Sequence, residues 1–172
     1  MGQYYVAIIL GETGIPTFVR TWVGPSGAKL MEHSYLKNPH VLAVEHLLSP
    51  KGMFYKSRLV WAGDYAEPEE GTTENLYHRV VEKEQEKEWQ TRESADYRYI
   101  VNHTKKVYID KQALSTNIHP LPLLTSEGNG AGGGDYRGDN EILCGNWARD
   151  VISVEHTIPE HYTEFNPEFG EH

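Results

Sequence analysis

The chain has 172 residues, of which 38% are hydrophobic and 24% are charged, a composition typical of one folded domain that needs no disulfide or metal to hold its core. Its 16 basic and 25 acidic residues give a net charge of -9, which disfavours a broad surface for nucleic acid or anionic membrane. The sequence has no apolar stretch of membrane-spanning length and no N-terminal secretory pattern, and its single cysteine, Cys144, favours a reducing, cytoplasmic compartment.

The chain opens with a pattern typical of a β-hairpin. Residues 3–10 (QYYVAIIL) are almost all aromatic, apolar or β-branched, which predicts a strand buried on both faces near the centre of a sheet. Turn residues follow at 11–16, and residues 17–23 (TFVRTWV) predict a second strand. These two strands are expected to pair in the antiparallel sense.

A helix is predicted to begin at Asn38 and Pro39. Asn38 is suited to cap free N–H groups, and Pro39 at the first helical position loses no hydrogen bond. The helix is expected to run to about Leu48, with Glu45 and His46 pointing away from the core. Its core-facing residues are expected to be Val41, Val44, Leu47 and Leu48.

The middle of the chain predicts three more strands and a second helix. Residues 58–62 (RLVWA) read as a short strand. Residues 73–90 predict a helix whose charged part at 82–88 (EKEQEKE) is expected to be solvated, because like charges four residues apart weaken it. Residues 97–102 and 107–110 predict a second hairpin with a basic tip.

The last third combines a long irregular stretch at 111–146 with a final strand at 151–157 (VISVEHT). We therefore expect an α+β fold: a single domain over residues 1–158, with a mostly antiparallel sheet of five to seven strands and two helices, followed by a polar C-terminal tail at 159–172. The core is expected to contain the large apolar side chains Tyr5, Ile8, Trp22, Val44, Leu48, Val60, Trp61, Ile100, Trp147 and Ile152.

The densest signal is the segment 127–138 (EGNGAGGGDYRG), which holds many of the chain's 16 glycines. Glycine is costly to order, so this density indicates positive φ angles, close approach to a ligand, or a flexible surface loop. Backbone N–H groups in such a segment can form an anion-binding nest. Gly128, Gly130 and Gly133 satisfy G-x-G-x-x-G, but no helix start follows and no Gly-Lys-Ser/Thr is present, so neither a dinucleotide nor a Walker motif is supported.

We expect residues 128–138 to be ordered and to lie against residues 61–64 and 147–150. A flexible linker mixes glycine with serine, whereas this segment ends in Asp135, Tyr136 and Arg137. Arg137 is predicted to contact an anionic group, because its planar fork matches a carboxylate or phosphate. The predicted ligand-binding residues are Asp64, Lys105, Gly130, Gly132, Gly133, Gly134, Asp135, Arg137 and Asp150.

Two histidines are candidates for acid–base chemistry. His103 lies in the predicted hairpin tip, residues 103–106, where a solvated basic turn is the favoured interpretation. His33 lies between Glu32 and Ser34, but adjacent side chains diverge, so a structured loop that leaves His33 partly exposed is favoured.

Metal and cofactor sites find no support in the sequence. No H-E-x-x-H or C-x-x-C spacing occurs among the nine histidines and the single cysteine. Cys144 follows Ile142 and Leu143, which favours a small buried residue over a nucleophile. No metal or cofactor is therefore assigned.

The function expected first is the binding of a small anionic molecule, such as a nucleotide, through the segment 127–138. Two alternatives stay open: an interaction protein that self-associates into a homo-oligomer, and a small hydrolase or transferase that uses His33 or His103. The acidic charge and the lack of catalytic signatures lower the enzyme alternative. The 11 tyrosines keep the interaction alternative open, since interfaces favour tyrosine.

Several motifs resemble those of a family of small uncharacterised proteins from bacteria and phages. They are MGQYY, KLMEHS, RLVWAGDYA, YRYIVNHTKK, IHPLPLL, EGNGAGGGDYRG and NWARDVISVE, and they extend from Gly2 to about Glu155. The resemblance implies no particular activity, cofactor or fold, so it carries no residue role to this chain.

Overall fold

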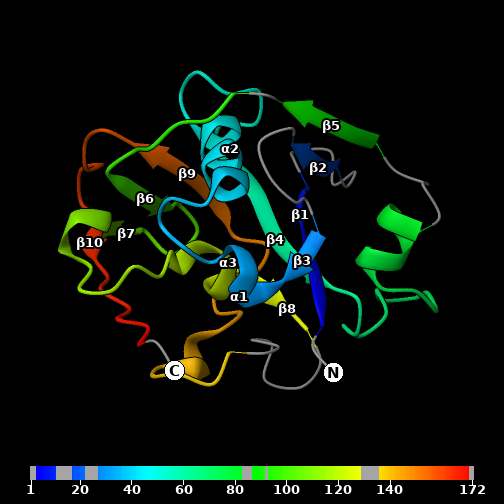
Figure 1. Ribbon diagram of the computed structural model, residues 1–172. Helices are drawn as coiled ribbons and strands as arrows, with labels where there is room; N and C mark the ends of the chain where they lie inside the picture. The colour runs from blue at the N-terminus through cyan, green and yellow to red at the C-terminus, as the bar shows by residue number, and fades with distance from the viewer. Residues whose placement is uncertain are drawn as a thin grey trace.

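A β-sheet with helices packed on one face is the frame of the protein (Figure 1). The computed structural model describes residues 3–10, 17–21, 27–82, 87–91, 93–128 and 136–170. The strands are β1 Tyr4–Ile9, β2 Thr17–Thr21, β3 Gly27–Lys29, β4 Ser57–Gly63, β5 Lys87–Thr91, β6 Tyr99–Asn102, β7 Val107–Asp110, β8 Ser126–Glu127, β9 Val151–Glu155 and β10 Thr163–Glu164. The α-helices are α1 Leu30–His33, α2 Pro39–Leu48 and α3 Pro120–Leu124; η1 His78–Glu82 is a short π-helix, and η2 Lys111–Ala113 and η3 Glu141–Leu143 are short 3₁₀-helices.

The sheet is mostly antiparallel. Its hydrogen-bonded path runs β10-β7-β6-β9-β4-β1-β2-β5, with β3 beside β1 and β8 beside β4. Among the described residues the parallel pairs are β10 with β7, β2 with β5, and β4 with β8, and the other pairs are antiparallel. The predicted α+β class, the mostly antiparallel sheet and both hairpins, β1–β2 and β6–β7, are confirmed.

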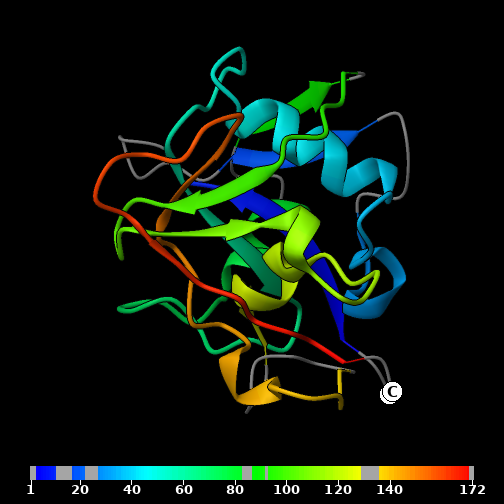
Figure 2. The same cartoon turned by 90° about the vertical axis from the view of Figure 1, so that its left-hand side faces the viewer.

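The strand β1 is buried on both faces, as its sequence predicts. Its odd-numbered residues from Tyr5 to Ile9 pack in a large core with α1, α2 and α3. Val6 and Ile8, together with Leu10 after the strand, pack in a smaller core with Leu76. The views in Figures 1 and 2 place α1, α2 and α3 over the same side of the sheet. All predicted core residues that the structure describes are buried, and Trp22 lies outside the described residues.

The helix α2 begins where the sequence predicts. The side chain of Asn38 accepts hydrogen bonds from the backbone N–H groups of His40, at 2.9 Å, and Val41, at 3.2 Å, and Pro39 occupies the first helical position. One expectation is wrong: Glu45 does not point to solvent but is fully buried. A buried carboxylate requires partners, and these define the site described below.

The predicted second helix ends early. Among the described residues of this region, the helical conformation covers residues 76–82, and residues 87–91 form β5, which pairs in parallel with β2 from Thr17↔Lys87 to Thr21↔Thr91. The prediction of a helix to Gln90 is therefore wrong. The like-charged pairs that weaken a helix here leave pairing with β2 as the better source of backbone hydrogen bonds.

The strand β4 divides one of its edges between two partners. Ser57 and Arg58 pair with β9, whereas Trp61 and Ala62 pair with β8. Between these pairings, Leu59 N donates to Asp150 O at 3.2 Å, and its carbonyl accepts from the N–H of residue 149 at 2.8 Å. The start of the glycine-rich segment and residues 147–150 are thus held on neighbouring parts of one strand.

The segment after Pro159, expected to be a polar tail, packs along the domain. Thr163 and Glu164 form β10 beside β7, and Phe169 is 2% exposed. Ser115 Oγ donates to a carboxylate oxygen of Glu168 at 2.8 Å. In the ranges that the structure describes, none of the helices is long and apolar enough to cross a membrane.

Candidate functional site

A cavity of about 420 Å³ opens beside the N-terminal part of α2. Four short stretches line it: residues 36–37 before α2, residues 96–98 before β6, residues 111–112 in η2, and His156 after β9. Three of the lining side chains are cations, Lys37, Arg98 and Lys111, and one is a carboxylate, Asp96. Cavities of this size take small ligands.

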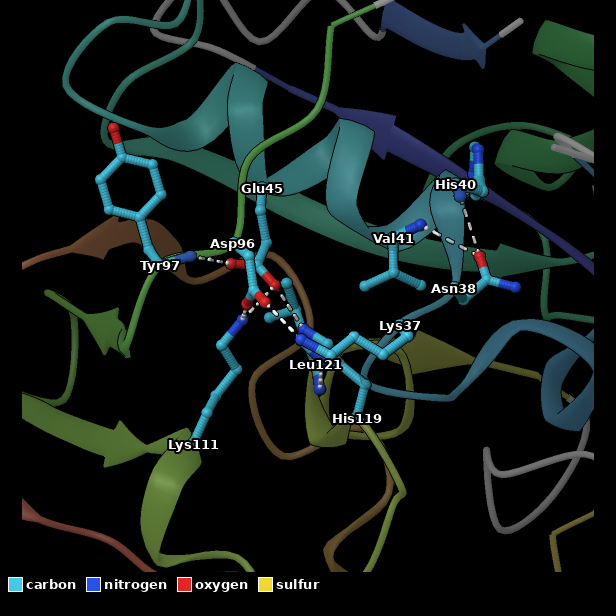
Figure 3. A network of polar contacts seen from close by, with 10 residues as sticks. All are labelled: Lys37, Asn38, His40, Val41, Glu45, Asp96, Tyr97, Lys111, His119 and Leu121. Atoms are coloured by element: carbon cyan, nitrogen blue, oxygen red, sulfur yellow. Dashed lines mark hydrogen bonds and ion pairs between the residues drawn. The ribbon is translucent and has the colours of Figure 1, made fainter. Parts of the chain in front are cut away.

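A network of charged groups leads from the cavity into the core (Figure 3). Lys37 Nζ lies 2.8 Å from Oδ2 of Asp96, and Lys111 Nζ lies 2.7 Å from Oδ1 of the same carboxylate. Lys111 Nζ also lies 2.7 Å from Oε2 of the buried Glu45. Charges therefore alternate in sign from the exposed Lys37 to the fully buried Glu45, which compensates each group.

The buried end of this network is His119. Its Nδ1 accepts a hydrogen bond from the backbone N–H of Leu121 at 3.2 Å, so Nε2 carries the proton and donates to Glu45 Oε2 at 2.7 Å. Burial lowers the pKa of His119, although Glu45 opposes this shift. With both ring nitrogens committed, His119 orders the carboxylate and has no lone pair left for base catalysis.

Asp96 is the one lining carboxylate and stays ionised. Burial alone raises its pKa, but the hydrogen bonds from Lys111 and Lys37 outweigh this effect and lower the pKa to about 2. Lys37 is 79% exposed on its side chain, so its ammonium group also meets solvent and the cavity. Arg98 pairs with Asp110 through two hydrogen bonds of 3.1 Å.

The middle of the glycine-rich segment lies outside the described residues. This applies to the predicted site residues Gly130, Gly132, Gly133, Gly134 and Asp135. Just before the glycines, β8 pairs with β4 at Trp61↔Ser126 and Ala62↔Glu127, and the expected position of residues 129–135 against residues 61–64 and 147–150 lies outside the described residues. The end of the segment is anchored by the buried Tyr136, whose hydroxyl donates to Gly170 O at 3.0 Å, while Arg137 is exposed and donates from Nη1 to Tyr136 O at 3.0 Å.

Arg149 holds the start of this segment, a role that the sequence did not indicate. Its guanidinium donates two hydrogen bonds to Glu127, at 2.7 and 2.8 Å, and two to Glu69, at 2.8 and 2.7 Å. Partial burial disfavours its charge, but both carboxylates outweigh this and raise the pKa of Arg149. Two bidentate pairs on one guanidinium fix the relative position of three chain segments.

Three further predicted ligand residues are engaged within the protein. Lys105 Nζ lies 2.7 Å from Oδ2 of Asp150, which also accepts from Asn102 at 2.8 Å. Asp64 Oδ1 accepts from the N–H of Tyr4 at 3.0 Å. The structure thus brings Lys105 and Asp150 together, but at the β6–β7 turn and not at the cavity.

His33 is fully buried, so the expectation of partial exposure is wrong. Its Nε2 accepts a hydrogen bond from Trp61 Nε1 at 2.9 Å, which places the proton on Nδ1. Within the described residues Nδ1 of His33 has no hydrogen-bond partner. The ring stacks on His40 with centroids 5.7 Å apart, and burial lowers the pKa of His33 to about 4. This places His33 in the core, away from any described cavity.

His103 contacts a serine, but in the wrong sense for hydrolysis. Ser153 Oγ donates to Glu155 at 2.6 Å, so it accepts from His103 Nε2 at 2.7 Å, and His103 Nδ1 accepts from Tyr162 at 2.9 Å. A serine nucleophile needs the opposite arrangement, in which the hydroxyl donates to the imidazole. Ser153 is also fully buried.

Cys144 is expected to be an unreactive thiol. It is 8% exposed, and burial, with a smaller effect from Glu141, raises its pKa to about 12. The thiolate is the reactive form of cysteine. The rate at which Cys144 reacts with a disulfide reagent at pH 8 is therefore expected to be roughly two to three orders of magnitude lower in the native protein than in the denatured protein. A stopped-flow comparison of the two states measures this ratio, and equal rates contradict the assignment.

The sequence contains no motif that marks the cavity or its charged network. One local signal existed: Glu45 stands among apolar residues of α2, and a charged residue in such a stripe needs a partner. In the part of the chain that the structure describes, no three His, Cys, Asp or Glu side chains are grouped to hold a metal ion. Comparison with known proteins adds no assignment, because no family model, no curated protein and no solved structure matches the chain.

Proposed function

We propose that the protein binds a small anionic molecule in the cavity lined by Lys37, Arg98 and Lys111. The observation that supports this most is the placement of the charges: three cations line the cavity, whereas only one of the three carboxylates that pair with them, Asp96, lines it. Glu45 and Asp110 lie behind the lining and hold Lys111 and Arg98 in place. Lys37 is the exposed cation that an incoming phosphate or carboxylate meets first.

The charged groups at the cavity are suited to binding a ligand and not to acid–base catalysis. Asp96 has both oxygens engaged by ammonium groups, and His119 has both nitrogens engaged, so neither is placed as a general base. The groups suited to interact with a ligand are hydrogen-bond donors and cations, which recognise phosphates and carboxylates. Recognition without chemistry is what this donor set supports.

The test is a titration of the full chain with ribose 5-phosphate, inorganic phosphate and citrate, by calorimetry and thermal shift. A ligand that binds only the folded state raises the melting temperature. Lys37→Ala is expected to weaken binding about tenfold, because it removes one charge-assisted contact. Lys105→Ala is the matched control: Lys105 is another exposed lysine paired with one aspartate, away from the cavity. Binding lost in Lys105→Ala but kept in Lys37→Ala rejects the cavity, and no binding of any anion rejects the function.

The glycine-rich segment is a second candidate location for the same function. Two exposed tyrosines, Tyr4 and Tyr65, flank Asp64, close to the end of β8 where this segment begins. Exposed aromatic rings suit the stacking of a nucleotide base. Arg137→Ala in the same titration distinguishes the locations: a loss of affinity places the ligand at this segment, and an unchanged affinity leaves the cavity.

A further inference from the structure

One wall of the cavity is a pair of stacked rings. The rings of Tyr97 and His156 have centroids 4.2 Å apart and an interplanar angle of 27°. Tyr97 is only 7% exposed, whereas His156 is exposed, and both line the cavity. The imidazole of His156 is therefore the outer layer of a stack whose inner layer is fixed in the protein.

This wall is held rigidly by the network behind it. The N–H of Tyr97 donates to Glu45 Oε1 at 3.2 Å, and the next residue, Arg98, accepts at its carbonyl from the N–H of Lys111 at 2.9 Å. The backbone that carries Tyr97 is thus tied to α2 on one side and to η2 on the other. A preformed aromatic surface loses little freedom when a ligand stacks on it.

We infer that the ligand carries a flat aromatic ring as well as its anionic group, which makes the nucleoside monophosphates the class of ligand that fits. This inference rests on the proposed function. The anionic group meets the exposed Lys37, and the ring extends the Tyr97–His156 stack. Bases stack on aromatic side chains through their π-faces without a required hydrogen-bond pattern, so the stack selects the ring and not a particular base.

The experiment compares adenosine 5'-monophosphate with ribose 5-phosphate, which carries the same phosphate on the same sugar but lacks the base. By calorimetry on the full chain, the nucleotide is expected to bind about tenfold more tightly, the effect of one stacked ring. Lys37→Ala is expected to lower the affinity for both ligands by the same factor, because both carry the same anionic group.

Two variants of His156 locate the effect. His156→Ala is expected to remove the preference for the nucleotide and leave ribose 5-phosphate within about twofold, whereas His156→Phe keeps a flat ring and keeps the preference. Equal binding of the two ligands to the unchanged protein, or a preference that survives in His156→Ala, overturns the inference while the proposed function stands. Binding of neither ligand also overturns the inference, and it overturns the proposed function as well when inorganic phosphate and citrate do not bind either. The comparison on the unchanged protein decides even where a variant fails to fold.

Discussion

Replacing Glu45 by alanine is expected to lower the free energy of unfolding by about 3–5 kcal/mol, the largest effect of any single substitution considered for this protein. Glu45 is fully buried and accepts from Lys111, from His119 and from the N–H of Tyr97. Its removal leaves the Lys111 ammonium, which is 7% exposed, with the partly exposed Asp96 as its remaining carboxylate partner. A buried charge that loses its partner costs far more than an exposed one.

Urea denaturation of the matched set measures this effect. Glu45→Gln is expected to fall between the unchanged protein and Glu45→Ala, because its single carbonyl oxygen serves His119 or Tyr97 but not both. Glu93→Ala is the control. Glu93 is 74% exposed and pairs with His46, which lies on α2 like Glu45, so this substitution is expected to lower the free energy of unfolding by no more than about 0.5 kcal/mol. A cost for Glu45→Ala no larger than that of Glu93→Ala contradicts the buried network.

The protein is expected to lose stability as the pH falls from about 6.5 to 4. Burial lowers the pKa of His33 to about 4 and that of His40 to about 3, with Glu32 opposing the shift at His33 and His33 adding to the shift at His40. The histidines of the unfolded chain have ordinary pKa values near 6.5, so the unfolded chain binds more protons than the folded chain in this range. The free energy of unfolding therefore decreases as the pH decreases. Each histidine contributes a loss of about 3 kcal/mol by pH 4, a large part of the stability of a typical domain.

Denaturation at several pH values between 7 and 4.5 tests this expectation. His40→Leu removes one buried titrating group. The number of protons taken up on unfolding, which sets the slope of the unfolding free energy against pH, is expected to fall by about one. His161→Asn is the control, because His161 is exposed and has a φ of 68°, which asparagine tolerates. A slope that is the same in His40→Leu as in the unchanged protein contradicts the assignment of His40 as a neutral buried group.

The parts of the fold that the sequence predicts are those whose cause is local. The almost continuous run of aromatic, apolar and β-branched residues at 3–10 identifies β1, and the pair Asn38 and Pro39 identifies the start of α2. The strand β5 escapes prediction because its partner, β2, lies far away in the sequence and supplies the backbone hydrogen bonds. The charged composition of residues 82–88 carries no trace of that partner.

The candidate site escapes prediction for the same physical reason. Its lining comes from four stretches that meet only in the folded chain, so no local motif marks it. Glu45 is instructive, since at 100° per residue it stands only about 40° around the helix from Val41, inside the apolar stripe. The helical geometry was thus sufficient to place this carboxylate in the core, but its partners Lys111 and His119 were not foreseeable from α2 alone.

The division of β4 between two partner strands has a consequence for synthesis on the ribosome. The strand β9 lies between β4 and β6 in the sheet, yet both of those strands leave the ribosome before it. Until residues 151–155 have been made, one edge of β6 and the start of β4 have no strand between them, and the apolar surface there stays open. This part of the sheet is therefore closed only when β9 is made, after every other described strand except β10, and until then its unpaired strand edges favour aggregation.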